Sequence, residues 1–242
     1  MNEIDWRIKA TGRVKKRAVI PATGDVFDKG SIIKLVSVIN FTKKRTLTIP
    51  VPDLTAIYIS SSEKSWNQYS KLKKKHNIIS TLKRQTSFKT DKAAFDAVEY
   101  IATSVITAYS AIESFCNDSI PNDHEFWHHK RSEIILEKSA KPDIERYFST
   151  MNKLNNILPE IYNVDPPKGK SPVWVSFKLL KSCRDSLIHA KSNETRSVGS
   201  SDSNLWDKLF KLNKPYILAR DIFNWYLSDH VNQPLWYKEY PN

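Results

Sequence analysis

The chain has 242 residues, of which 40% are hydrophobic and 11% aromatic, and these proportions exclude a disordered chain and favour one large or two small globular domains. Its 38 Lys and Arg against 26 Asp and Glu give a net charge of +12, which favours a nucleic acid or an acidic protein as partner over a neutral small substrate. A protein from a lysine-rich proteome would have the same balance, so charge alone does not identify the partner.

The amino terminus and the cysteine content favour a cytoplasmic protein. Residues 1–7 contain no apolar stretch of the signal-peptide type, and no run of about 18 apolar residues occurs, so we expect no membrane span. Cys116 and Cys183 both fall on apolar faces of expected helices, which favours reduced core thiols over a disulfide.

Residues 1–61 are interpreted as a small N-terminal β subdomain, an antiparallel sheet of four or five strands. Arg13–Pro21 is a basic run with β-branched residues, and turn signals follow it. Ser31–Phe41 is apolar on both faces, which predicts a central strand, and prolines confine the next strand, Arg45–Val51, to an edge. Thr55–Ser60 is expected to add one more strand. The sheet could shield a helix face, join a dimer or grip RNA through its basic side chains, which are Lys15, Lys16, Arg17, Lys43, Lys44 and Arg45.

From Ser62 onward the hydrophobic period becomes helical, so residues 62–242 are predicted to form a helical domain. Ser65–Gln85 is expected to be the first helix, and Thr90 is placed to cap the longest one, Asp91–Ser119. The first helix has a cationic face that is either solvated or follows RNA phosphates, made of Lys71, Lys73, Lys74, Lys75, His76, Lys83 and Arg84.

The expected helix Asp91–Ser119 has an apolar seam with a carboxylate at its margin. The seam residues recur at alternating three- and four-residue steps and are Phe95, Val98, Ala102, Val105, Tyr109, Ile112 and Cys116. Glu113 directly follows the seam residue Ile112, and Asn117 lies one turn further along the same face. A carboxylate in such a position usually has a cationic partner, for which Arg184 is our candidate; otherwise Glu113 is an ordinary exposed residue.

The middle of the chain is predicted to contain two shorter helices. Asn122-x-x-Glu125 resembles a capping box, and Lys141-Pro142-Asp143 is expected to begin the helix Ile144–Ile157, before a loop at Pro159–Pro172. His124-Glu125-Phe126-Trp127-His128 also matches the His-Glu-x-x-His signature of zinc hydrolases. We disfavour a metal site there, because the motif would begin a helix instead of lying inside one.

Val173–Lys191 is predicted to be a helix with the strongest candidate for chemistry, Arg184-Asp185-x-x-x-His189. Asp185 and His189 are four residues apart on one face, so the carboxylate can hold one imidazole nitrogen and leave the other free for proton transfer. Arg184 adds a permanent cation whose planar fork suits phosphate. An acid–base group beside a phosphate clamp is what cleavage of a phosphodiester requires. After a polar connector, Ser192–Ser203, the last helix is expected at Asn204–His230, with a kink at Pro215.

The hexapeptide from Arg184 to His189 is similar to the Arg-x4–6-His motif of the HEPN superfamily. Ala108–Asn117 resembles the helix that carries an acidic residue in many HEPN domains, and the resemblance covers about residues 65–230. The expected fold class is therefore α+β, mainly α: a small antiparallel β subdomain at residues 1–61, followed by a HEPN-like helical bundle at residues 62–242. The resemblance also implies a homodimer in which two copies of the motif share one cleft.

By this resemblance the protein would be a metal-independent endoribonuclease that needs no cofactor and cleaves RNA through attack by the 2′-OH. His189 would act as general base or acid, Arg184 would stabilise the charged phosphorane, Asp185 would orient the imidazole, and Glu113 would hold Arg184. Further contacts with RNA are expected from Asn117, Lys181, Lys191, Lys73, Lys74 and Lys75. A toxin or phage-defence effector with an inhibitor or sensor protein as partner would also fit the resemblance.

The spacing of the motif sets a geometric condition. On a regular helix Arg184 and His189 diverge by about 140°, so one helix cannot aim both side chains at one phosphate unless its end unwinds or a second copy contributes. Two other functions are compatible with these residues. A non-catalytic RNA-binding or regulatory module would bind RNA in a salt-sensitive way that His189→Ala does not change. A pure interaction subunit would use the cationic helix against an acidic protein.

Overall fold

The computed structural model describes residues 4–9, 11–19, 21, 24–78, 86–129, 135–169, 172–190 and 205–240. In these residues the protein is α+β and mainly α, with short antiparallel strands first and helices after them, as the sequence predicts. The chain divides into two compact units: Met1–Ile57 together with Val231–Asn242, and Tyr58–His230. The second unit contains every described residue that the sequence singles out for catalysis.

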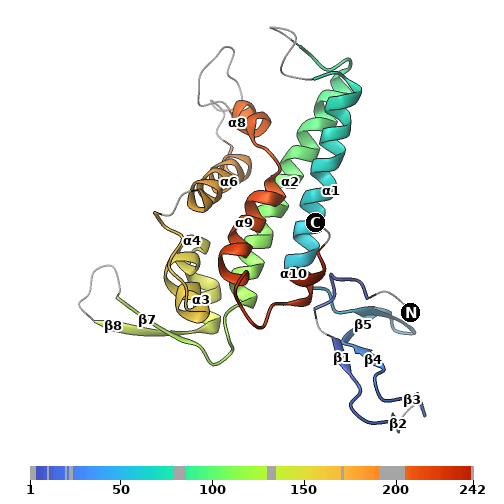
Figure 1. Cartoon of the computed structure of the whole chain (residues 1–242). Helices are drawn as coiled ribbons and strands as arrows, with labels where there is room; N and C mark the ends of the chain where they lie inside the picture. Colours follow the sequence, from blue (N-terminus) through green and yellow to red (C-terminus); the bar gives the residue numbers. More distant parts are fainter. Residues whose placement is uncertain are drawn as a thin grey trace. The chain divides into compact units, whose positions relative to one another are not determined.

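The strands of the first unit form separate antiparallel pairs (Figure 1). The pairs in its described residues are β1 (Thr11–Arg13) with β4 (Ile32–Lys34), β2 (Ala18–Val19) with β3 (Val26–Phe27), and β5 (Val36–Thr42) with β6 (Arg45–Pro50).

The prediction of one sheet with four or five strands is therefore wrong. Ser31–Phe41 is not a central strand either, because the chain leaves the β4 pairing at Leu35 and then forms a local hairpin, with Ile39 opposite Leu47. In the described part of the chain β5 pairs with β6 alone, so the side chains of β5 stay exposed, and Phe41 is 67% exposed. Apolar residues on both faces indicated a buried strand, but burial depends on neighbours that local sequence does not specify.

The first long helix, α1 (Leu54–Lys75), begins where one more strand was predicted. Asp53 caps it, because its Oδ1 accepts a hydrogen bond from the Ala56 N–H at 3.0 Å. The strand prediction for Thr55–Ser60 is wrong for this reason. The expected start of the helix at Ser65 is too late, and the helix ends at Lys75, before the expected end at Gln85, which lies outside the described residues. Asn77 follows with φ 53°, a left-handed conformation that does not continue a helix. The short helix α10 (Leu235–Glu239) belongs to the first unit, where the ring of Tyr240 meets that of Trp6 edge-on at 4.9 Å.

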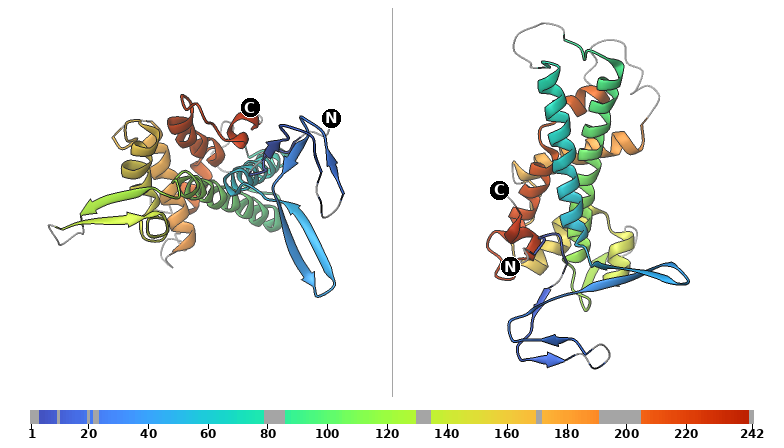
Figure 2. Two further views of the ribbon diagram at one scale, coloured as in Figure 1. Left: turned by 90° about the horizontal axis from the view of Figure 1, so that it is seen from below. Right: turned by 90° about the vertical axis from the view of Figure 1, so that its right-hand side faces the viewer.

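In the second unit, α1 and α2 (Asp91–Asp118) lie side by side and run in opposite directions (Figures 1 and 2). Two serines join them: Ser62 Oγ donates to the Ser104 carbonyl at 2.8 Å, and Ser104 Oγ donates to the Ser62 carbonyl at 2.9 Å. Thr90 caps α2 as predicted, since its Oγ1 accepts from the Ala93 N–H at 3.2 Å. Phe95, predicted to begin the apolar seam, is 66% exposed instead. The small residues Ala93 and Ala97 are buried in its place.

Two helices from the second half of the chain, α6 (Val173–Ile188) and α9 (Pro215–Leu227), pack against α2 and against each other. The core between them is apolar and aromatic, with Ile112, Phe115, Phe177, Leu180, Ile222 and Phe223 almost fully buried. The predicted final helix is divided into α8 (Leu205–Lys211) and α9. Lys214 adopts a left-handed conformation, with φ 42°, and Pro215 begins α9, so the proline starts a new helix and does not kink a continuous one.

The segment between α2 and α6 contains a hairpin and a series of short helices. Strand β7 (Glu125–His129) pairs with β8 (Leu136–Ala140), so the helix predicted from the capping box is wrong. The predicted helix Ile144–Ile157 is interrupted at Phe148, whose backbone is extended, and Ser149 caps the next turn. The resulting helices are α3 (Lys141–Tyr147), α4 (Thr150–Asn152), the π-helix η1 (Lys153–Ile157) and α5 (Leu158–Tyr162). Among the described residues no helix is long and apolar enough to cross a bilayer.

Candidate functional site

Glu113 on α2 and Arg184 on α6 form an ion pair, which confirms the pairing expected from the sequence. Arg184 Nη2 lies 3.5 Å from Glu113 Oε1, and the two side chains are 28% and 38% exposed. The guanidinium also lies over the ring of Tyr109, one turn before Glu113, with 4.7 Å between the guanidinium carbon and the ring centre. Arg184 is therefore held from two sides by residues of α2, while part of it remains open to solvent.

Asp185 is bound by two cations from its own helix. Arg184 Nη1 donates to Asp185 Oδ1 at 3.0 Å, and Lys181 Nζ bonds Asp185 Oδ2. Burial alone would raise the pKa of the Asp185 carboxyl, but the hydrogen bonds and charges of Lys181 and Arg184 outweigh burial and lower this pKa. Among the described residues the hydrogen bond expected from the His189 imidazole to the Asp185 carboxylate is not formed, and Lys181 and Arg184 bind this carboxylate instead.

His189 lies at the end of the motif helix. Helix α6 ends at Ile188, and His189 is its C-cap, with φ −117° and ψ 40°. Its backbone N–H donates to the Asp185 carbonyl at 2.9 Å, while its side chain is exposed. Within the described part of the chain the imidazole has no hydrogen-bond or ion-pair partner. The helical hydrogen-bond pattern therefore continues up to His189, which directly follows the last residue of α6.

Helices α4 and η1 supply two polar side chains that the sequence did not single out. Thr150 Oγ1 donates to Glu113 Oε1 at 3.3 Å, and Lys153 Nζ donates to Asn117 Oδ1 at 2.7 Å. Both side chains are buried, with exposed fractions of 7% and 5%. A lysine is ordinarily exposed, and local sequence does not show that the partners of Lys153 lie on α2 and α3. Tyr109 was predicted as part of the apolar seam, so its contact with Arg184 was also missed.

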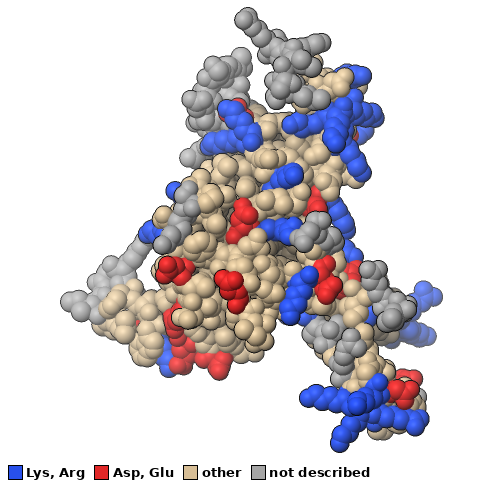
Figure 3. All heavy atoms as spheres, viewed as in Figure 1, with Lys and Arg blue, Asp and Glu red and all other residues tan. Residues whose placement is uncertain are grey.

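Of the lysines expected to bind RNA, Lys181 is the one that lies at the motif within the described residues. Lys181 is engaged with Asp185, and Lys191 lies outside the described residues, as do Lys83 and Arg84. Lys73, Lys74 and Lys75 form the last turn of α1, where Figure 3 shows Lys and Arg side chains gathered. Because Ser62 and Ser104 lie opposite each other, these lysines are about 30 Å from Glu113 along the α1–α2 hairpin. They are too far away to contact the same phosphate as Arg184.

The two cysteines are free and fully buried, as expected of reduced core residues. Burial raises the pKa of the Cys183 thiol to about 11 and also raises that of the Cys116 thiol. Neither thiol is therefore a nucleophile for catalysis.

The His-Glu-x-x-His sequence lies mostly on strand β7. Two histidines four residues apart on an extended strand are about 13 Å apart, too far for one metal ion. His128 Nε2 instead shares a hydrogen bond with Ser139 Oγ across the hairpin at 2.9 Å. The described residues contain no group of His, Cys, Asp and Glu that could hold a metal.

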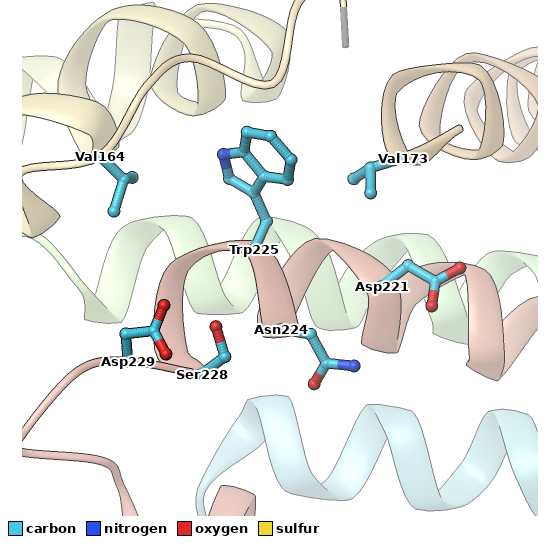
Figure 4. Close-up of a pocket in the computed structure, with 7 residues that line it drawn as sticks. All are labelled: Val164, Val173, Asp221, Asn224, Trp225, Ser228 and Asp229. Atoms are coloured by element: carbon cyan, nitrogen blue, oxygen red, sulfur yellow. The ribbon is translucent and has the colours of Figure 1, made fainter. Parts of the chain in front are cut away.

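An open pocket of about 440 Å³ lies along α9, away from the motif (Figure 4). It is lined by Val164, Val173, Asp221, Asn224, Trp225, Ser228 and Asp229. The Trp225 indole N–H donates to the Asp165 carbonyl at 2.9 Å, and burial raises the pKa of the Asp221 carboxyl. Two carboxylates would repel phosphate, so this pocket is not suited to the RNA backbone.

The polar groups that the structure brings together are Tyr109, Glu113 and Asn117 from α2, Thr150 and Lys153 from α4 and η1, and Lys181, Arg184 and Asp185 from α6. Arg184 contacts Tyr109, Glu113 and Asp185. The exposed imidazole of His189 follows at the end of the same helix. Such a site can bind an anion and transfer a proton. Comparison of the chain with protein-family models, curated proteins and solved structures finds no match.

Proposed function

We propose that the protein is a metal-independent endoribonuclease of the HEPN type. The observation that carries this proposal is the Glu113–Arg184 ion pair at 3.5 Å, with the exposed imidazole of His189 five residues beyond Arg184. The position of Glu113 at the margin of the apolar seam of α2 predicts a cationic partner of this kind. The Glu113 carboxylate and the Tyr109 ring hold the Arg184 guanidinium in one orientation. The guanidinium therefore does not have to move when negative charge develops during the reaction.

The chemistry proceeds by transfer of the phosphoryl group within the RNA. The His189 imidazole accepts the proton of a ribose 2′-OH, the 2′-oxygen forms a bond to phosphorus, and the bond from phosphorus to the 5′-oxygen breaks. An imidazolium returns a proton to the departing 5′-oxygen. Arg184 stabilises the negative charge that develops on the phosphorane. The products are a 2′,3′-cyclic phosphate and a 5′-OH end.

A homodimer is part of this proposal. Acid and base act on opposite sides of the phosphorus, so two imidazoles are more suitable than one, and a second copy of α6 would supply the other His189. A closed two-fold dimer places identical residues on both sides of one cleft. The test is the oligomeric state by light scattering, together with mixed dimers of wild-type and His189→Ala chains. Loss of cleavage in the mixed dimer supports one cleft that needs both imidazoles, whereas about half of the wild-type activity would indicate two independent sites.

The second candidate is an RNA-binding module without turnover. It is favoured by the engagement of Arg184 with both Glu113 and Asp185, because a cation with two carboxylate contacts has less charge available for a phosphorane. This candidate predicts that RNA binding weakens as salt rises and is the same in wild type and His189→Ala.

The experiment that decides between them is cleavage of end-labelled tRNA and mRNA in EDTA. We expect cutting by wild type, and a loss of about a hundredfold or more in His189→Ala and Arg184→Ala. Matched controls are His129→Ala, an exposed histidine on β7, and Arg146→Ala, an exposed arginine that stacks on Tyr147. Equal cutting by all five proteins would overturn the site, and binding without cutting would support the second candidate.

A further inference from the structure

Among the described residues of the second unit, Lys153 is a buried cation that the proposed chemistry does not use. Its side chain lies in the π-helix η1, and the residue is only 5% exposed. Burial lowers the pKa of its ammonium group, which the charges of Glu145 and Glu113 partly offset. A buried lysine is costly, so its hydrogen-bond partners indicate what it does.

The ammonium group of Lys153 has two partners. Nζ donates to Asn117 Oδ1 at 2.7 Å and to the Glu145 carbonyl at 3.0 Å. An ammonium group can only donate hydrogen bonds, so the amide oxygen of Asn117 must face Lys153. The amide nitrogen of Asn117 then has to point the other way. Within the described residues this nitrogen has no hydrogen-bond partner, and the Asn117 side chain is partly exposed.

The Lys153–Asn117 contact is one of two parallel contacts between the same elements. Thr150 and Lys153, three residues apart, reach Glu113 and Asn117, which are four residues apart on α2. Glu113 in turn contacts Arg184. The Asn117 amide group is thus held about 6 Å along α2 from the carboxylate that positions the arginine.

We propose that Lys153 is a positioning residue that turns Asn117 into an uncharged hydrogen-bond donor for a phosphate oxygen of bound RNA, beside the oxygen bound by Arg184. This inference rests on the proposed function. The two N–H groups of the Asn117 amide can bind a phosphate oxygen and so fix the position of the phosphodiester. Because the amide carries no charge, it does not attract the Glu113 carboxylate away from Arg184.

The first test is a double-mutant cycle on RNA binding. The probe is a fluorescent 12-nucleotide RNA with a 2′-O-methyl group on every ribose, which the proposed reaction cannot cleave. Lys153→Met and Asn117→Ala should each weaken binding about tenfold, the range of one hydrogen bond to a charged group. The double variant should bind no more weakly than either single variant, because Lys153 acts only through Asn117. Additive losses would overturn the inference.

Two further variants keep this test decisive. Lys153→Gln retains a polar group and can either donate to Asn117 or accept from it, so it no longer selects one orientation. It should bind RNA as weakly as Lys153→Met. If Lys153→Met does not fold, Lys153→Gln replaces it in the double-mutant cycle. Lys141→Met removes a comparable lysine, whose Nζ donates to the Ile120 carbonyl at 2.6 Å, and should change RNA affinity less than twofold. A tenfold loss in this control would mean that charge alone matters, against the inference.

A second readout does not depend on RNA. The side-chain amide resonances of Asn117, identified by their loss in Asn117→Ala, should report one orientation in wild type and exchange between two orientations in Lys153→Gln. If wild type cleaves RNA but the cycle is additive, only this inference fails. If wild type neither cleaves nor binds RNA, the proposed function and the phosphate ligand fail together, and the resonances still decide whether Lys153 orients Asn117.

Discussion

Thr150 on α4 and Arg184 on α6 contact the same oxygen atom of Glu113. Thr150 Oγ1 donates to Oε1 at 3.3 Å, and Arg184 Nη2 lies 3.5 Å from it. The carboxylate therefore joins three separate segments of the second unit through one atom. Glu113 lies between the buried hydroxyl of Thr150 and the partly exposed guanidinium of Arg184. A substitution at Glu113 therefore tests whether this contact matters for cleavage, for stability or for both.

Glu113→Gln should show whether the negative charge of Glu113 is needed, because glutamine has nearly the same size as glutamate but no charge. The amide keeps an oxygen for Thr150 but removes the negative charge that holds Arg184. We expect RNA cleavage to fall about tenfold or more, while the free energy of unfolding changes by less than about 1 kcal/mol, because the pair is partly exposed. Cleavage rates and urea denaturation measure the two effects. Glu99→Gln, an exposed change on the same helix, is the control, and an equal loss in both variants would contradict the role of Glu113.

The Asp185 carboxyl should make stability depend on pH in the acid range. Its pKa is lowered in the folded protein from an ordinary value of 3.8, so its contacts with Lys181 and Arg184 stabilise the fold above that value. This contribution is lost as pH falls through the lower pKa of the folded state. Urea unfolding of wild type and Asp185→Asn should therefore differ most at pH 5 and above, and converge toward pH 2. A constant difference over this range would contradict the ion pairs, and Asp229→Asn, on the surface, is the control.

Two phenylalanines should differ sharply in their effect on stability. Phe177 is fully buried and stacks on Tyr109 with ring centres 6.1 Å apart, so Phe177→Ala should cost about 3–5 kcal/mol. It should also loosen the ring beneath Arg184 and reduce cleavage. Phe41, on the exposed strand β5, should change the free energy of unfolding by less than about 0.5 kcal/mol when replaced by Ala. A large effect of Phe41→Ala would mean that this side chain is covered in solution.

The lysines at the end of α1 should affect the salt dependence of RNA binding more than catalysis. Replacing Lys73, Lys74 and Lys75 by Ala should lower the slope of log affinity against log salt concentration by about 2 for a long single-stranded RNA, if each contacts one phosphate. The turnover of a bound short RNA should be unchanged, because the lysines are about 30 Å from Glu113. Matched alanines at Lys138, Lys168 and Lys178 control for net charge. An unchanged slope would remove these lysines from the RNA site.

Local rules predicted the features that depend on residues a few positions apart. Thr90 caps α2 because its hydroxyl reaches an N–H three residues on, and α2 and α6 begin at their predicted first residues, Asp91 and Val173. The same rules failed where two local signals competed. The capping box at Asn122–Glu125 gave way to the β7–β8 hairpin, whose pairing partner lies beyond the turn. Thr55–Ser60 has the residues of a strand, but the Asp53 cap makes it helical.

The candidate site was accessible to sequence reasoning only in part. The sequence determined that Arg184, Asp185 and His189 share one helix end, and that Glu113 stands at the margin of an apolar seam and needs a cation. The tertiary structure decided that Glu113 meets Arg184 and that Lys153 is buried against Asn117. The pairing of Asp185 with Lys181 and Arg184 is local to α6 instead, and the sequence analysis assigned this carboxylate to His189. Helix periodicity specifies which face a side chain occupies, but its partner is set by packing between segments that are 36 to 71 residues apart in the chain.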